Sequence, residues 1–108
     1  MTQEVIALTL EDIMALRVKV LRKDTPVTHC NYPEDTYEDV IHLGVKNENT
    51  VVGTSSWFRK ECPDLDGEAA IQLKGMAVDD SLQGSGIGVQ IIAAGLALAT
   101  ERGVSIVW

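Results

Sequence analysis

The chain has few basic residues, and this shortage limits its partners. Its 108 residues include 9 lysines and arginines against 16 aspartates and glutamates, which gives a formal charge of −7. An acidic chain disfavours nucleic acid as a partner, because nucleic-acid binding calls for a basic face. The same charge gives an anionic ligand no long-range attraction. Any phosphate group would therefore have to be held by local donors.

The chain also lacks metal-type cysteine spacing, long apolar runs and a leader-like N-terminus. Its two cysteines, Cys30 and Cys62, are far apart, and His29 beside Cys30 has no partner residues, so no metal site is expected. No segment reaches the roughly 20 apolar residues of a membrane span. The N-terminus has no basic region followed by a long apolar core, as a signal peptide would. These absences predict a cytoplasmic protein with no membrane partner.

The first third of the sequence predicts a strand, a helix and a long loop within one domain over residues 1–108. A strand over 5–8 precedes a helix whose N-cap is Thr9, with Asp12 three residues on. Apolar residues at helical spacing form a stripe for the core: Ile13, Leu16, Val20 and Leu21. The charged Arg17, Lys19 and Arg22 are placed on or near the other side. Residues 23–39 lack periodicity, and the acidic stretch 34–39 is interpreted as a solvated charge run or, less readily, as an attractor of a cationic amine.

The remaining residues predict an antiparallel meander followed by a crossover. Apolar runs at 40–45, 51–59 and 69–78 are separated by turn-forming residues at 47–49 and 62–67. A helix over 89–101 then leads to a short strand over 104–108. This last strand should lie parallel to the strand that precedes the helix.

The most informative motif joins the third meander strand to that helix. It reads Gln83-Gly84-Ser85-Gly86-Ile87-Gly88. Main-chain N–H groups in such a turn converge on one point, where the helix dipole adds about half a positive charge. Glycine lets the backbone approach an anion closely. The motif is interpreted as a pyrophosphate cradle. The alternative is a turn without ligand.

Other glycine-rich loops fit the sequence less well. A dinucleotide-binding fingerprint would need its third glycine at Val89. A Walker loop would need a Gly-Lys-Ser/Thr ending, which does not occur here.

Gln83, Gly86 and Gly88 make the pattern Gln-x-x-Gly-x-Gly, which resembles the signature loop of the GNAT superfamily of acyl-CoA-dependent N-acyltransferases. The segment 74–78 resembles that family's fourth strand. The resemblance implies an α/β fold of the α+β type, with a mixed, mostly antiparallel sheet and flanking helices. By the same resemblance the chain ends inside the family's fifth strand, so the usual C-terminal elements are expected to be missing.

The resemblance further implies that the chain binds acetyl-CoA and transfers its acetyl group to a primary amine of a small molecule or peptide. The implied cofactor-binding residues are Met76, Ala77 and Val78 for the pantetheine arm and Gln83, Gly84, Ser85, Gly86, Ile87, Gly88 and Val89 for the pyrophosphate. An N–H group near Ala77 is the implied oxyanion donor. Gly75 either marks the irregularity that opens the cleft or only relieves packing.

Catalytic side chains are harder to assign. Gln72 stands where some relatives carry a glutamate base, and it either positions a water or merely faces solvent or the edge of the core. The family's acid is a tyrosine beyond the fifth strand, and neither Tyr32 nor Tyr37 matches its position. The alternative function is therefore a non-catalytic acyl-CoA-binding or self-associating remnant of the fold.

The helix after the loop has no charged residue between Asp80 and Glu101. A helix that is apolar all round is normally buried, and a sheet can cover only one side of it. We therefore expect a homo-oligomer formed through helix residues 88–101 or through the edge strand 104–108. The alternative is that the alanines make a tolerable surface.

Overall fold

The computed structural model describes residues 4–21 and 32–108, so Cys30 and His29 lie outside the described residues. The elements, in chain order, are β1 (Ile6–Leu8), α1 (Leu10–Leu21), the 3-10 turn η2 (Pro33–Thr36), β2 (Ile41–Asn47), β3 (Thr50–Arg59), β4 (Ala70–Val78), the 3-10 turn η3 (Asp80–Leu82), α2 (Ile87–Glu101) and β5 (Ile106–Val107). No helix in the described part of the chain is long and apolar enough to cross a membrane.

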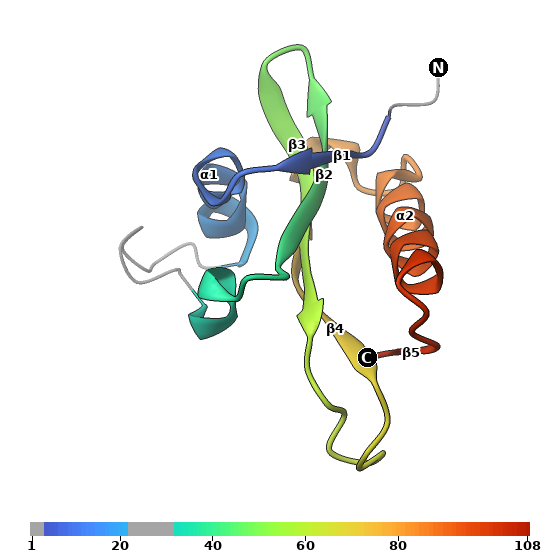
Figure 1. Cartoon of the computed structure of the whole chain (residues 1–108). Coiled ribbons are helices and arrows are strands. Elements are labelled where there is room, and N and C mark those ends of the chain that lie inside the picture. The colour runs from blue at the N-terminus through green and yellow to red at the C-terminus, as the bar shows by residue number, and fades with distance from the viewer. Residues whose placement is uncertain (1–3, 22–31) are drawn as a thin grey trace.

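The strands form one sheet in the order β1-β2-β3-β4-β5. Neighbouring strands are antiparallel except β4 and β5, which are parallel because α2 carries the chain across the sheet. Helix α1 and the η2 turn lie on one face of the sheet, and α2 lies on the other (Figure 1). The predicted α+β fold with a mixed, mostly antiparallel sheet is confirmed.

Helix α1 begins as its sequence predicts. The Thr9 hydroxyl accepts a hydrogen bond from the Asp12 N–H, and the Asp12 carboxylate accepts one from the Thr9 N–H, both at 3.1 Å. This reciprocal pair satisfies two main-chain donors that a helix start leaves open.

The predicted face of α1 is wrong at two positions. Leu21, assigned to the core, is 40% exposed, whereas Arg17, assigned to the other side, is fully buried. Arg17 follows Ile13 by four residues, and this spacing puts the two side chains on the same face. Helix geometry therefore directs the Arg17 side chain into the protein. Its charge is paired there with Asp35.

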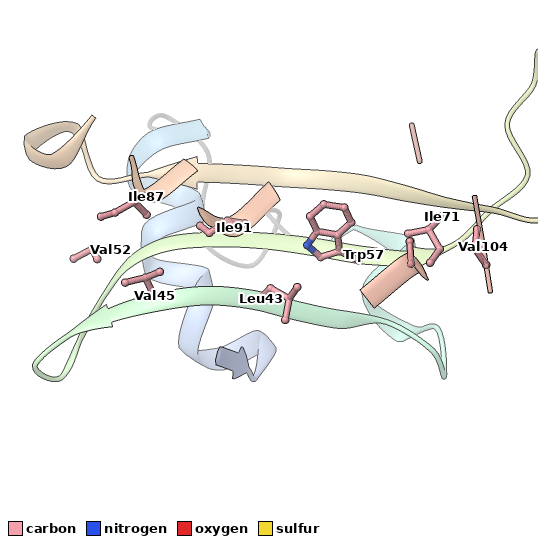
Figure 2. Close-up of a cluster of buried hydrophobic side chains, with 9 residues drawn as sticks. Leu43, Val45, Val52, Trp57, Ile71, Ile87, Ile91 and Val104 are labelled. Carbon is pink, nitrogen blue, oxygen red and sulfur yellow. The ribbon is translucent and has the colours of Figure 1, made fainter. Parts of the chain in front are cut away.

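The main core lies between the sheet and α2. Figure 2 shows Trp57 between Ile91 of α2 and Ile71 of β4. A Cβ atom on Gly95 would lie 2.1 Å from the Trp57 ring, so α2 approaches β3 more closely than an alanine would allow. The buried cluster comprises Leu43, Val45, Val52, Trp57, Ile71, Ile87, Ile91, Ala99 and Val104.

Strand β5 is shorter than predicted, because the segment 104–108 contributes only Ile106–Val107 to the ladder while Val104 packs in the core. Its register pairs Ala70 with Ile106 and Ile71 with Val107. The last link is a 2.8 Å hydrogen bond from the Leu73 N–H to the Trp108 carbonyl. Among the described residues, no strand pairs with that side of β4 beyond Leu73.

Candidate functional site

Strand β4 carries a bulge at the point where β5 leaves it. Ser56 lies opposite Lys74 and Thr54 opposite Ala77, so β4 has one residue more than β3 over this stretch. Gly75 has a φ of +64°, a conformation that favours glycine. Of the two interpretations of Gly75 from the sequence, the structure supports the bulge.

The bulge decides which main-chain groups of β4 face the open side. The Asp79 N–H donates to the Val52 carbonyl on β3 at 2.8 Å. Main-chain groups alternate in direction along a strand, so those of Ala77 face β3 and those of Met76 and Val78 face away from it. The N–H groups of Met76 and Val78 are therefore the nearest candidates for the donor that the sequence placed near Ala77.

The glycine loop turns directly into α2. Gly84 and Gly86 have φ values of +86° and +91°, and Gly86 is the N-cap of the helix. No atom lies within 4 Å of the position that a Cβ would take at either glycine. The positive φ angles, and not a lack of space, therefore favour glycine at both positions. The first N–H groups of α2 have no carbonyl within the helix to bind. They point outward at the positive end of a 15-residue helix.

A pocket of about 350 Å³ opens at this helix start. Its lining is Val78, Leu82, Gln83, Gly84, Gly86, Ile87, Gly88 and Val89. The pocket thus brings together most of the predicted cofactor-binding residues, whereas Met76, Ala77 and Ser85 do not line it. No charged side chain belongs to the lining, so an anion here would depend on main-chain donors.

Internal hydrogen bonds brace the loop. The Gln83 side-chain amide donates to the Val78 carbonyl at 3.3 Å and to the Asp80 carboxylate at 3.2 Å. Both the N–H and the hydroxyl of Ser85 donate to the Leu82 carbonyl. Both donors of Ser85 are therefore used within the loop, and its place in the cofactor site stays a prediction.

Asp79, at the end of β4, anchors the same loop. Its carboxylate accepts from the Ser81 N–H at 3.1 Å and pairs with Lys19 of α1 at 2.8 Å. The Lys19 ammonium group, followed by the donors of Ser81, lowers the pKa of Asp79 to about 2. The charge of Asp79 is thus compensated near the pocket.

Gln72 lies on β4 opposite Phe58, in the part of the strand that still pairs with β5. Its side-chain carbonyl oxygen is buried and has no hydrogen-bond partner among the described residues. An unsatisfied buried acceptor is costly, and a bound water or amine would relieve that cost. The catalytic role assigned to Gln72 stays a prediction.

The prediction that the acidic stretch 34–39 is a solvated charge run is wrong for Glu34 and Asp35, whereas Glu38 is exposed to solvent. Glu34 is 5% exposed, and its two oxygens bind Lys60 and Lys74 at 2.9 and 3.0 Å. Lys60 first and Lys74 second lower the pKa of Glu34 to about 2. Asp35 binds Arg17 through two hydrogen bonds, at 2.8 and 3.2 Å. These carboxylates are therefore occupied by internal cations and are not free to attract an amine.

The Arg17–Asp35 pair continues into a buried polar chain on the α1 face of the sheet. Arg17 donates to the Ser56 hydroxyl at 3.0 Å, and this hydroxyl lies 2.6 Å from His42 Nδ1. Burial lowers the pKa of His42, with Asp35 opposing and Arg17 adding to the effect. This network of hydrogen bonds could not be predicted from the sequence, because its four side chains come from four separate elements.

The fold and the loop together define a class: an α+β protein whose second helix begins in a glycine loop with exposed N–H groups, beside a strand edge that no other described strand covers. The sequence matches the model of the acetyltransferase (GNAT) family over residues 10–108. It is 30% identical over 105 residues to the uncharacterized N-acetyltransferase YitI of Bacillus subtilis (strain 168), covering 97% of this chain and 70% of that protein. The chain belongs to the GNAT acetyltransferase family.

Solved structures agree on the fold. Glucosamine-6-phosphate N-acetyltransferase from Arabidopsis thaliana has a TM-score of 0.73 at 13% identity, over 100% of this chain and 81% of that one. The aminoglycoside acetyltransferase AAC(6')-Iy, in complex with a bisubstrate analogue containing CoA, has a TM-score of 0.79 at 15% identity, over 100% and 78%. At such identities the likeness is one of fold alone.

Proposed function

We propose that the chain is an N-acetyltransferase domain, spanning residues 1–108, that transfers acetyl from acetyl-CoA to a primary amine of a small molecule or peptide. Membership of the acetyltransferase family supports acyl transfer in general. The observation that carries the proposal is the pocket at the start of α2, where two glycines with positive φ expose the first N–H groups of the helix. A cytoplasmic location is part of the same proposal.

In this proposal the pyrophosphate lies against residues 83–89, with the N–H groups of Ile87, Gly88 and Val89 as its donors. The pantetheine arm runs along the free side of β4 and bonds to the main chain of Met76 and Val78. Acetyl-CoA supplies the thioester. The amine attacks its carbonyl carbon, and a β4 N–H group stabilises the resulting oxyanion. Gln72 orients a water that removes the amine proton, and the C–S bond then breaks. Coenzyme A leaves as the thiolate and takes up that proton, and the amide is the other product.

The test compares alanine substitutions at two glycines, where the positive φ imposes a similar backbone strain on alanine but only one of the two positions lies at the pocket. Gly86 and Gly67 both have positive φ and open space at the Cβ position, but only Gly86 lines the pocket. We expect Gly86→Ala to weaken coenzyme A binding at least tenfold by titration calorimetry, the loss of about 1.4 kcal/mol that one good hydrogen bond accounts for. Gly67→Ala should leave binding unchanged. A folded wild-type protein that gives no heat with coenzyme A or acetyl-CoA would exclude the proposal.

A non-catalytic acyl-CoA-binding module is the second candidate, because no histidine or carboxylate among the described residues lines the pocket at the start of α2. Release of free thiol from acetyl-CoA across a panel of amines separates the two. Binding without amine-dependent release identifies the module, and binding with release identifies the enzyme.

We also propose that the protein self-associates through α2. Val89, Ile92 and Leu96 share the outer face of the helix and are 73%, 40% and 47% exposed. Such a ridge favours a protein partner, and a second copy of the chain supplies the same apolar face. Light scattering should give a dimer that Leu96→Glu converts to a monomer. A stable wild-type monomer at micromolar concentration would contradict it.

A further inference from the structure

The ring of Tyr32 lies directly over the bulge in β4. A Cβ atom on Gly75 would stand 2.9 Å from Tyr32 Cε2 and 3.4 Å from the Tyr32 hydroxyl oxygen. The positive φ of Gly75 and the tyrosine ring therefore exclude a side chain at this position for two independent reasons. The sequence assigned Tyr32 only to an early loop with no part in the site.

Two cations hold this ring in place. Arg17 Cζ lies 4.2 Å from the ring centroid and Lys74 Nζ lies 4.7 Å from it. Each cation is fixed in turn by a carboxylate, Arg17 by Asp35 and Lys74 by Glu34. Cation–π contacts of partly desolvated groups favour one ring position, so the ring cannot swing away without disturbing charged pairs.

The main chain of Tyr32 is tied to the same network. Its N–H donates to Asp35 Oδ2 at 2.8 Å, and its carbonyl accepts from the Asp35 N–H at 3.0 Å. Arg17 then reaches Ser56 of β3, which lies opposite Lys74 in the sheet. The η2 segment is thereby fastened to β3, through Arg17, and to β4, through Lys74, the two strands that pair at the bulge.

We propose that Tyr32 is a positioning residue for acyl transfer and acts through Gly75. Its ring packs against Gly75 on the side where a Cβ would stand, and this contact keeps the strand from relaxing to a regular ladder. The bulge in turn directs the main chain of Met76 and Val78 toward the open side of β4. The inference rests on the proposed function, in which those groups hold the acyl arm. The aromatic ring alone holds the bulge in place, and the phenol hydroxyl is not required.

The experiment compares Tyr32→Ala, Tyr32→Leu and Tyr32→Phe with Tyr37→Ala as the control. Tyr37 lies on the same segment, is 38% exposed, and its ring meets the edge of Phe58 instead of the bulge. Three quantities are measured: amide hydrogen exchange of residues 75–78 without ligand, the Kd of coenzyme A, and kcat for acetyl transfer to the most active amine of the panel.

We expect Tyr32→Ala and Tyr32→Leu to speed amide exchange at the bulge and to lower kcat by up to about 10²-fold, the scale of a misplacement of about 1 Å. The Kd of coenzyme A should rise by a smaller factor than kcat falls, because only the pantetheine contacts at Met76 and Val78 are disturbed, while the pyrophosphate loop is held by its own hydrogen bonds. Tyr32→Phe and Tyr37→Ala should behave as wild type.

Each other result overturns the inference. Unchanged exchange and kcat in a folded Tyr32→Leu protein would show that the ring does not hold the bulge. An equal loss of kcat in Tyr32→Phe would assign the effect to the hydroxyl. A wild-type protein that binds no coenzyme A would refute the proposed function, while amide exchange in the variants would still decide whether Tyr32 fixes the bulge.

Discussion

At the scale of single residues, hydrogen-bond counting assigns the tautomer of His42. The Ser56 hydroxyl accepts a hydrogen bond from Arg17, which has only donors to offer. The single proton of this hydroxyl is then free to go to His42 Nδ1, 2.6 Å away. The hydroxyl oxygen has two lone pairs, but if it also accepted from an Nδ1–H group its own proton would have no acceptor among the contacts of the described residues. Donation to His42 Nδ1 satisfies this proton, which assigns the ring proton to Nε2.

This arrangement predicts that His42 stays neutral as the pH falls below its usual range. Burial lowers its pKa in the folded state below the ordinary value of 6.5. The unfolded chain then takes up the proton first, so the contribution of His42 to stability is complete above pH 6.5 and is lost as the pH falls through the folded-state pKa. Imidazole nitrogen shifts measured by NMR against pH should show an Nε2–H ring at pH 6.5. A charged His42 at that pH would contradict the prediction.

Residue-level prediction from sequence succeeded where partners are local and failed where they are distant. The Thr9 cap was predictable, because its partner Asp12 is three residues away. The burial of Arg17 was not, because Asp35 and Ser56 approach it only after the sheet has formed. A buried arginine is stable only when it is paired, and the pairing residues looked like part of a solvated acidic run.

At the scale of elements, the packing of α2 on β3 reverses an ordinary expectation about glycine. Gly95→Ala should gain up to about 1 kcal/mol of helix propensity. The new Cβ would lie 2.1 Å from the Trp57 ring, however, and overpacking of a rigid core costs about 1–3 kcal/mol or more. We expect a net loss of about 2 kcal/mol in the free energy of unfolding, measured in urea. Ala97→Gly, at an exposed position, controls for propensity alone. A Gly95→Ala protein as stable as wild type would show that α2 can shift.

The η2 turn should make the protein sensitive to acid. Lys60 and Lys74 lower the pKa of Glu34 from its ordinary value of 4.5 to about 2. A carboxyl with a depressed pKa stabilises the fold fully above pH 4.5, and this stabilisation is lost as the pH falls through about 2. The difference in unfolding free energy between wild type and Glu34→Gln should therefore shrink steadily below pH 4.5. A constant difference down to pH 2 would mean that the lysines do not act on Glu34.

Elements with a clear period were predictable, and irregular ones were not. The meander, α2 and the parallel placement of β5 followed from alternation, apolar content and the crossover through α2. From the sequence, Gly75 could mark a bulge or only relieve packing. The two could not be separated, because the sequence does not determine the φ angle of a glycine within a strand. The position of η2 depends on contacts with β3 and β4, which local sequence does not encode.

At the scale of the whole molecule, the positive charges are mostly used internally. Ion pairs hold Arg17, Lys19, Lys60, Lys74 and Arg102 against carboxylates within the described residues. The chain as a whole carries a formal charge of −7, and the lining of the pocket at the start of α2 contains no cation. In the proposed function, coenzyme A therefore meets long-range repulsion from the acidic protein and short-range attraction from the N–H groups at the start of α2.

The long-range repulsion and the short-range attraction respond differently to salt. The Debye length falls from about 30 Å at 0.01 M to about 10 Å at 0.1 M ionic strength. Added salt therefore screens the repulsion between the acidic protein and coenzyme A, while the N–H donors at the start of α2 act within contact distance and are screened much less. We expect the Kd of coenzyme A to fall on the order of a few-fold between 0.01 and 0.1 M sodium chloride. Titration calorimetry over this range measures it, and dephospho-coenzyme A, which carries less charge, should show a smaller change. A steep rise of Kd with salt would mean that lysine or arginine side chains hold the phosphates, and the main-chain cradle would then not be the binding site.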